Sequence, residues 1–186
     1  IVSVDVGQDT PNNGPEGIAV NPVNGHLFVV NQKNPRVLLE LNAAREIMAS
    51  YPIDFAPPFD IKDLSGLFYD DVQQELWFLS AGSQKIVVTN STLEPLRRYS
   101  LDVEAPEGLA VDSSRDLVFI VSDTNDQLYI YDRVSLMNPR PHHVAETDYV
   151  FDFWSAEEPD FSYPPHMSFQ MSGMDDPRLS DEPVAP

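Results

Sequence analysis

The sequence contains no cysteine, so disulfide bonds cannot hold the fold together and thiol chemistry is excluded. Basic residues are scarce: 11 Lys and Arg stand against 30 Asp and Glu, for a formal net charge of −19. Nucleic acids and anionic membrane surfaces would be repelled by such a chain, whereas cations, basic proteins and neutral glycans remain open as partners. No apolar run approaches the roughly 18 residues of a spanning helix. We therefore expect neither nucleic-acid binding nor a membrane-spanning segment.

Motifs of known catalytic chemistry are lacking as well. The sequence holds no phosphate-binding loop and no dinucleotide-binding fingerprint. None of the four histidines (His26, His142, His143 and His166) lies in a recognisable serine or cysteine motif. The adjacent pair has too few spaced ligands around it for zinc. The sequence thus leaves enzyme activity uncertain and leans against it.

Three copies of one repeated unit organise most of the chain. The copies begin at Gly17, Gly66 and Gly108, and each glycine is followed four residues later by Asn or Asp. A small polar residue fourteen positions after each glycine closes an apolar run, and a further apolar segment begins at position twenty. Repeats of this length, made of short β runs, predict the blades of a β-propeller. Three blades do not close a propeller ring, so we expect the chain to be part of one.

Each unit is predicted to be a four-stranded blade in an all-β fold. The expected strands lie near 17–21, 26–31, 36–42 and 46–53, then 66–70, 75–80, 85–90 and 95–102, then 108–112, 117–122, 127–132 and 142–150. The predicted division is an outer strand of a preceding blade with a linker (1–13), three blades (14–62, 63–104 and 105–150) and an extended C-terminal tail (151–186). The apolar runs are continuous, which is expected where both faces of a sheet are covered.

The repeated glycines have two readings. Inner strands approach one another closely at the narrow centre of a propeller, and a residue without Cβ removes the crowding there. The alternative is direct contact of the glycine backbone with a ligand. We favour the structural role, in which the glycines relieve crowding between the inner strands.

Both ends of the chain differ from the repeats. The sequence starts without Met in an alternating segment at 1–6, so we expect a processed or excised piece with any targeting signal upstream. The acidic, proline-rich C-terminal segment carries aromatic residues that we predict to bind a partner: Tyr149, Phe151, Phe153, Trp154, Phe161 and Tyr163. Such an arm docks on a sheet edge or a neighbouring subunit, or else folds back on its own blade.

The glycine motifs resemble those of one known family. The segments Pro-Glu-Gly-Ile-Ala at 15–19, Asp-Leu-Ser-Gly-Leu at 63–67 and Pro-Glu-Gly-Leu-Ala at 106–110 resemble the SdiA-regulated family of β-propellers. They are also similar to motifs of the broader NHL-like and gluconolactonase-like six-bladed propellers. The resemblance covers roughly residues 14–133 and implies the last three blades, half of a six-bladed ring. It further implies an exported protein: extracellular, periplasmic or at the cell surface.

Two sets of polar residues are candidates for a site. Glu16 and Glu107 directly precede a repeated glycine, whereas the middle repeat has Ser65 at that position and Asp63 two residues earlier. The three carboxylates are predicted to converge at one mouth of the ring and to hold Ca²⁺. Lactone-hydrolysing relatives in the broader group use a metal in a comparable place, and chelator-insensitive stability would contradict this prediction. The alternative is that these acids bond neighbouring backbone N–H groups or pair with a base. The second set closes the second strands and binds a ligand or, as we favour, makes turns: Asn31, Ser80, Ser122 and Asp123.

Two functions follow from these observations. The first is a non-catalytic interaction or assembly module, completed by another chain, a second copy or a further segment. The second is a metal-dependent, lactonase-like hydrolase or a small-ligand-binding propeller. We favour the first, because the acid does not stand at the same position in all three repeats. Open blade faces rich in apolar residues demand a partner, so we expect the isolated chain not to be a stable monomer.

Overall fold

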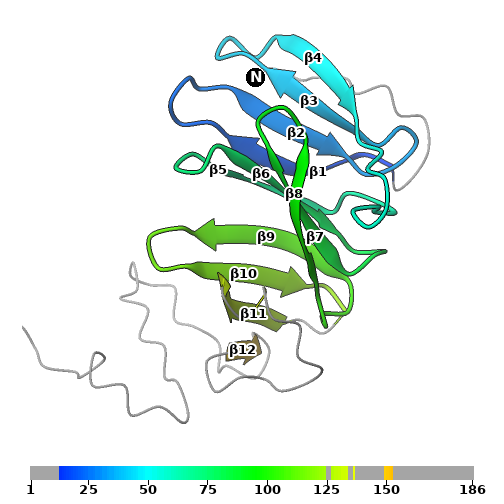
Figure 1. The fold of residues 1–186 in the computed structure, drawn as a ribbon, viewed down its shortest axis with the longest axis vertical. Helices are drawn as coiled ribbons and strands as arrows, with labels where there is room; N and C mark the ends of the chain where they lie inside the picture. The colour runs from blue at the N-terminus through cyan, green and yellow to red at the C-terminus, as the bar shows by residue number, and fades with distance from the viewer. Residues whose placement is uncertain (1–12, 125–126, 134–135, 137–148, 153–186) are drawn as a thin grey trace, which may run out of the picture. The chain divides into compact units, whose positions relative to one another are not determined.

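The computed structural model describes residues 13–124, 127–133, 136 and 149–152, which form three antiparallel sheets of four strands (Figure 1). The first sheet holds β1 (Pro15–Val20), β2 (Leu27–Asn31), β3 (Val37–Leu41) and β4 (Ile47–Pro52) in sequence order. The second holds β5 (Gly66–Asp70), β6 (Glu75–Ser80), β7 (Lys85–Asn90) and β8 (Pro95–Ser100). The third holds β9 (Pro106–Asp112), β10 (Leu117–Ser122), β11 (Gln127–Asp132) and β12 (Tyr149–Asp152). The prediction of an all-β fold made of three four-stranded blades is confirmed.

The fourth strand of the third blade lies later in the chain than predicted. We expected it near 142–150, whereas β12 spans Tyr149–Asp152 and pairs antiparallel with β11. The aromatic and β-branched run Tyr-Val-Phe favours a strand at this position more than the proline-containing stretch before it. The predicted outer strand of a preceding blade, and the tail beyond Asp152, lie outside the described residues.

The hydrophobic core consists of two layers, one between each pair of neighbouring blades. One layer joins Phe28, Val30 and Leu38 of the first blade to Leu76 and Phe78 of the second. The other joins the second blade to the third, through residues that include Trp77, Leu79, Val88, Val118 and Ile120. Successive residues of β6 therefore point into opposite layers, and all six of its residues are buried. This sandwiching explains the continuous apolar runs of the sequence.

Neighbouring inner strands approach so closely at Gly17 that no side chain fits there. A Cβ atom on Gly17 would lie 2.8 Å from the backbone nitrogen of Leu67 and 3.0 Å from the carbonyl carbon of Gly66, both on the next blade. At Gly66 a Cβ would lie 3.5 Å from the backbone oxygen of Glu107 on the third blade. At Gly108 the nearest atom is the Val121 Cγ2 of its own sheet, at 2.6 Å. The close-approach reading of the glycines is thus confirmed between the first two blades.

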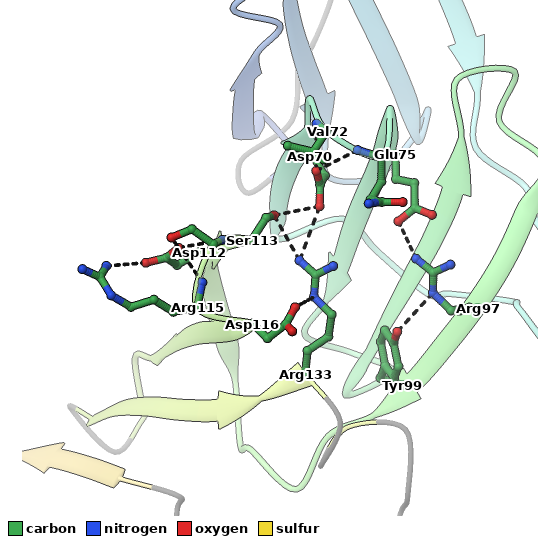
Figure 2. Close-up of polar contacts among 12 residues, drawn as sticks. Asp70, Val72, Glu75, Arg97, Tyr99, Asp112, Ser113, Arg115, Asp116 and Arg133 are labelled. Atoms are coloured by element: carbon green, nitrogen blue, oxygen red, sulfur yellow. Dashed lines mark hydrogen bonds and ion pairs between the residues drawn. The ribbon is translucent and has the colours of Figure 1, made fainter. Parts of the chain in front are cut away.

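A polar network joins the second and third blades at the C-terminal ends of their inner strands, β5 and β9 (Figure 2). The buried Asp70 carboxylate accepts hydrogen bonds from the backbone N–H groups of Val72 and Gln73, each at 3.1 Å. Across the blade boundary it also accepts from the Ser113 hydroxyl at 2.8 Å and pairs with Arg133 at 3.4 Å. The network therefore satisfies a buried charge while connecting two blades.

The Arg133 guanidinium completes this connection by packing on an aromatic ring. It lies 5.2 Å from the centroid of Trp77, within the range of a cation–π contact. Trp77 in turn stacks on Tyr99, whose hydroxyl accepts a hydrogen bond from Arg97 at 3.2 Å. Arg97 pairs with the buried carboxylate of Glu75. The face of the second blade that meets the third is therefore both aromatic and ion-paired.

Replacing Gly17 by alanine tests the close approach of the inner strands. The added Cβ would collide with backbone atoms that cannot rotate away, so we expect Gly17→Ala to lower the free energy of unfolding by about 1–3 kcal/mol. Gly14→Ala is the matched control, because a Cβ there would meet nothing within 4 Å. Urea unfolding of the two variants and the wild type measures the difference. Equal stability of both variants would contradict the packing described above.

Acid titration of stability tests the Asp70 network. Burial acts to raise the pKa of Asp70, but the hydrogen bonds from Gln73 and Ser113 and the charge of Arg133 hold it below its ordinary value of 3.8. A lowered folded pKa contributes stability that is present above the unfolded pKa and is lost as the pH falls through the folded pKa. Wild-type stability should therefore decline from about pH 5 downward more steeply than that of Asp70→Asn.

The same variant has a second readout at neutral pH. Asp70→Asn removes the negative charge that faces Arg133, and we expect it to cost about 2–3 kcal/mol at pH 7. Urea unfolding at several pH values gives both quantities. If the free energy of unfolding of the two proteins falls in parallel with pH, the Asp70 network does not stabilise the fold through its charge.

Candidate functional site at the start of the inner strands

The inner strands β1, β5 and β9 begin at the same end of the blades. Gly17 of β1 lies against Gly66 and Leu67 of β5, and Gly66 faces Glu107 of β9. Farther along, Asn21 after β1 donates a hydrogen bond to the Tyr69 hydroxyl of β5 at 3.2 Å. Neighbouring inner strands therefore run in the same direction. We call the end where these strands start the mouth. It is defined by Glu16, Asp63 and Glu107 and includes Gln32, Lys33 and Ser65.

The carboxylates of the mouth lie close enough to influence one another. Partial burial raises the pKa of Glu107, and the negative charges of Glu16, Asp123 and Asp63 raise it further, while Lys33 opposes the shift. The structure thus gathers the predicted acids around Glu107. It also adds a cation, Lys33, that the sequence interpretation did not include.

Asp63 is already engaged by the protein itself. It is almost fully buried, and its Oδ1 accepts hydrogen bonds from the Ser80 hydroxyl at 2.6 Å and the Gly82 backbone N–H at 3.0 Å. Its Oδ2 lies 3.0 Å from the same N–H and 3.7 Å from the Lys33 ammonium. A Cβ on Gly82 would lie 2.7 Å from this oxygen. Asp63 therefore holds the turn that follows β6.

These partners leave Asp63 poorly suited to bind a metal. Calcium needs six to eight oxygen ligands. The carboxylate oxygens of Asp63 already accept hydrogen bonds from Ser80 and Gly82 and pair with Lys33. Among the residues that the structure describes, no three His, Cys, Asp or Glu side chains are grouped closely enough to hold a metal ion. The calcium site of Glu16, Asp63 and Glu107 stays a prediction, and the geometry favours the alternative role for Asp63.

The residues that close the second strands make turns and loop contacts. Asn31, Ser80 and Ser122 are buried at equivalent positions of the three blades. The Asn31 amide donates to the backbone oxygens of Lys33 and Pro35 at 2.9 and 2.7 Å. The Ser122 hydroxyl donates to the backbone oxygen of Glu104 at 2.6 Å. Asn31 thus holds the turn after its strand, as expected of a small polar residue, whereas Ser122 ties the end of β10 to the segment before β9.

Some residues of the mouth were missed by sequence reasoning. The buried side-chain oxygens of Asn31 and Gln32 have no hydrogen-bond partner among the described residues. Ser65 donates from its hydroxyl to the backbone oxygen of Pro106 at 2.8 Å, which joins the second blade to the third. A signal for Gln32 and Lys33 was present in the sequence, since they are the two residues that follow Asn31, which closes the apolar run.

The remaining predicted residues are placed as follows. Asp123 is exposed beside Ser122, and its backbone N–H donates to the oxygen of Ala105 at 3.3 Å. Two of the predicted partner-binding residues, Tyr149 and Phe151, lie on β12 opposite Ile130 and Leu128 of β11. The other four, Phe153, Trp154, Phe161 and Tyr163, lie outside the described residues.

Removing the charge of Glu107 tests the crowding of acids at the mouth. The pKa of Glu107 is raised in the folded protein above its ordinary value of 4.5. Its contribution to the free energy of unfolding is therefore fully present below pH 4.5 and is lost as the pH rises through the folded pKa. Glu107→Gln should therefore be more stable than the wild type at pH 7, by about 0.5 kcal/mol because the side chain is partly exposed. The difference should vanish at about pH 4. Glu104→Gln, at an exposed position, is the control and should show no such gain.

Comparison with known proteins identifies the family and the fold. A model of the SdiA-regulated family matches residues 2–131. No curated protein sequence matches the chain. Many solved structures do match it in fold.

Three of these solved structures illustrate the likeness. Hydrazine synthase of Kuenenia stuttgartiensis matches at a TM-score of 0.51 and 13% identity, over 72% of this chain and 37% of that protein. Glutaminyl cyclase of Myxococcus xanthus matches at a TM-score of 0.52 and 10% identity, over 64% of this chain and 48% of the enzyme. A chain of a nidogen–laminin complex matches at a TM-score of 0.50 and 17% identity, over 66% and 44%.

At these identities the structural likeness shows the fold alone, and the chain spans less than half the length of each of these proteins. The three sheets resemble propeller blades, as the match to hydrazine synthase illustrates. The family match covers all three inner strands and all three repeated glycines. The chain therefore belongs to the SdiA-regulated family of β-propeller proteins.

Proposed function

We propose that this chain is a non-catalytic interaction and assembly module, whose three blades are completed into a ring by further blades. The observation that carries the proposal is the contrast between the middle blade and the end blades. Every residue of β6 is buried, because this blade has a neighbour on each face. The first and third blades each have one neighbour among the described residues.

The outward faces of the two end blades expose apolar side chains. On β1, Ala19 is buried toward the second blade, while Ile18 and Val20 point the other way and are 63% and 52% exposed. On the third blade, Val118 and Ile120 are buried toward the second blade, while Val121 is 42% exposed. Exposed apolar faces of this kind mark interaction surfaces. A further blade packed on each face would bury them as the inner layers are buried.

Two further points support a binding role. The matched nidogen–laminin structure is a protein–protein complex with a similar fold. The resemblance to the family implies an exported or surface-associated protein. No helix among the described residues is long and apolar enough to cross a membrane.

A lactonase-like hydrolase is less well supported, because Asp63 holds a turn and the described acids do not form a three-ligand group.

Charged substitutions on the outward faces test the proposal. Ile18→Asp and Val121→Asp place a carboxylate where a further blade would pack, so we expect either change to reduce the mass of the native assembly. Each should also lower the midpoint of thermal unfolding by several degrees, about the effect of 1–2 kcal/mol. Sedimentation velocity and circular dichroism measure the two effects.

Val72→Asp is the matched control for these variants. Val72 is 71% exposed, but it lies in the turn after β5 and not on an outward blade face. It should leave both the native mass and the melting midpoint unchanged. If all three variants behave as the wild type does, the outward faces are not interfaces and the assembly role is wrong.

A further inference from the structure

A cleft lies at the opposite end of the inner strands from the mouth. It is a cleft of about 370 Å³ between the first two blades, at the lower end of the size range of small-molecule sites. The turns that follow β1, β5 and β7 supply its rim, through residues such as Asn24, Asp71 and Ser91. Residues of both blades line it, so the cleft exists only where the two sheets pack together.

The floor of the cleft is aromatic and apolar. Phe28 of the first blade and Tyr69 of the second have ring centroids 5.4 Å apart, and Leu76 is almost fully buried beside them. The Tyr69 hydroxyl is held by the Asn21 amide at 3.2 Å. This bond crosses the blade boundary and fixes the Tyr69 side chain in the cleft. The floor therefore offers a fixed aromatic surface to a ligand.

The walls of the cleft carry negative charge without a balancing Lys or Arg. Glu40 and Asp71 both line it, and no Lys, Arg or His is among its lining residues in the described part of the chain. Both oxygens of Glu40 are already bonded, one to His26 Nδ1 at 2.8 Å and the other to the Tyr51 hydroxyl at 3.1 Å, so Asp71 is the acid left for a ligand. Asp71 is exposed and forms no ion pair with any described residue. Burial and then the Asp71 charge raise the pKa of Tyr69, which places that carboxylate near the floor.

We infer that this cleft binds a small organic cation, an ammonium or guanidinium group, with its charge at Asp71 and its carbon chain on Phe28 and Tyr69. Aromatic faces attract such cations, and carboxylates form charge-assisted hydrogen bonds with their N–H groups. Anions are repelled by the same walls. The group comes either from a free diamine or from a basic side chain of a bound polypeptide. This inference does not depend on the assembly role proposed above.

Titration of the full chain with matched amides tests the inference. N-acetyl-argininamide carries the guanidinium, and N-acetyl-citrullinamide is its neutral analogue of nearly equal shape. We expect the arginine compound to shift the NMR amide signals of Asn24, Asp71 and Gln74, with an affinity that falls as salt is added. The citrulline compound should leave those signals in place. Putrescine, titrated in parallel, identifies the source: tighter binding than the arginine compound favours a free diamine, and weaker binding favours a basic side chain.

Two variants locate the binding. Asp71→Asn should weaken binding of the arginine compound about three- to fivefold, a modest factor because the carboxylate is exposed. Glu104→Gln removes the same charge from an exposed position before β9 and should leave the affinity unchanged. Asp71 lies in an exposed turn, so its substitution should not unfold the protein, and a melting curve verifies this. Equal binding of the two amides, shifts outside the cleft only, or unchanged affinity in Asp71→Asn would overturn the inference.

Discussion

The close approach of neighbouring inner strands is the constraint on which the rest of this structure depends. The backbone of Gly17 lies so near Gly66 and Leu67 that a single added carbon would collide with main-chain atoms. Only at such a distance do the side chains of adjacent sheets interdigitate into the two core layers that bury Phe78 and Trp77. The mouth, the cleft and the polar network all lie at boundaries between blades. Each of them therefore exists because two sheets meet at this spacing.

The turn after the inner strand of each blade is held by the same local hydrogen bond. The Asn or Asp four residues after each repeated glycine accepts a hydrogen bond from a backbone N–H two residues later: Val23 to Asn21 at 3.0 Å, Val72 to Asp70 at 3.1 Å, and Ser114 to Asp112 at 3.0 Å. The hydroxyl of Ser114 and the guanidinium of Arg115 also bond Asp112 and lower its pKa to about 2. The repeat thus encodes its turns as well as its strands. Where an acid is buried between blades, as at Asp70, a cation from the next blade is added.

The repeat allowed the strands and blades to be predicted closely, because each strand is a local pattern of apolar residues between turn formers. The strands of the first two blades begin and end within about two residues of the expected positions. The contacts between blades could not be predicted in the same way. Arg133 meets Asp70, and Tyr69 meets Asn21, across long stretches of sequence that carry no shared pattern. The predicted calcium ligands illustrate the same limit: spacing brought Asp63 to the mouth but did not reveal that Ser80 and Gly82 already occupy its oxygens.

The outward faces of the two end blades expose the apolar side chains of Ile18, Val20 and Val121, which further blades would cover under the proposed assembly role. The most direct test is the mass of the native particle formed by the wild-type chain, measured by light scattering during size-exclusion chromatography. A single chain has a mass of 20.9 kDa. We expect the chain alone to give no sharp species of that mass. Stable particles that unfold cooperatively should contain additional blades from a second copy, a partner or a further segment. A sharp monomer of 20.9 kDa that unfolds cooperatively would contradict this expectation.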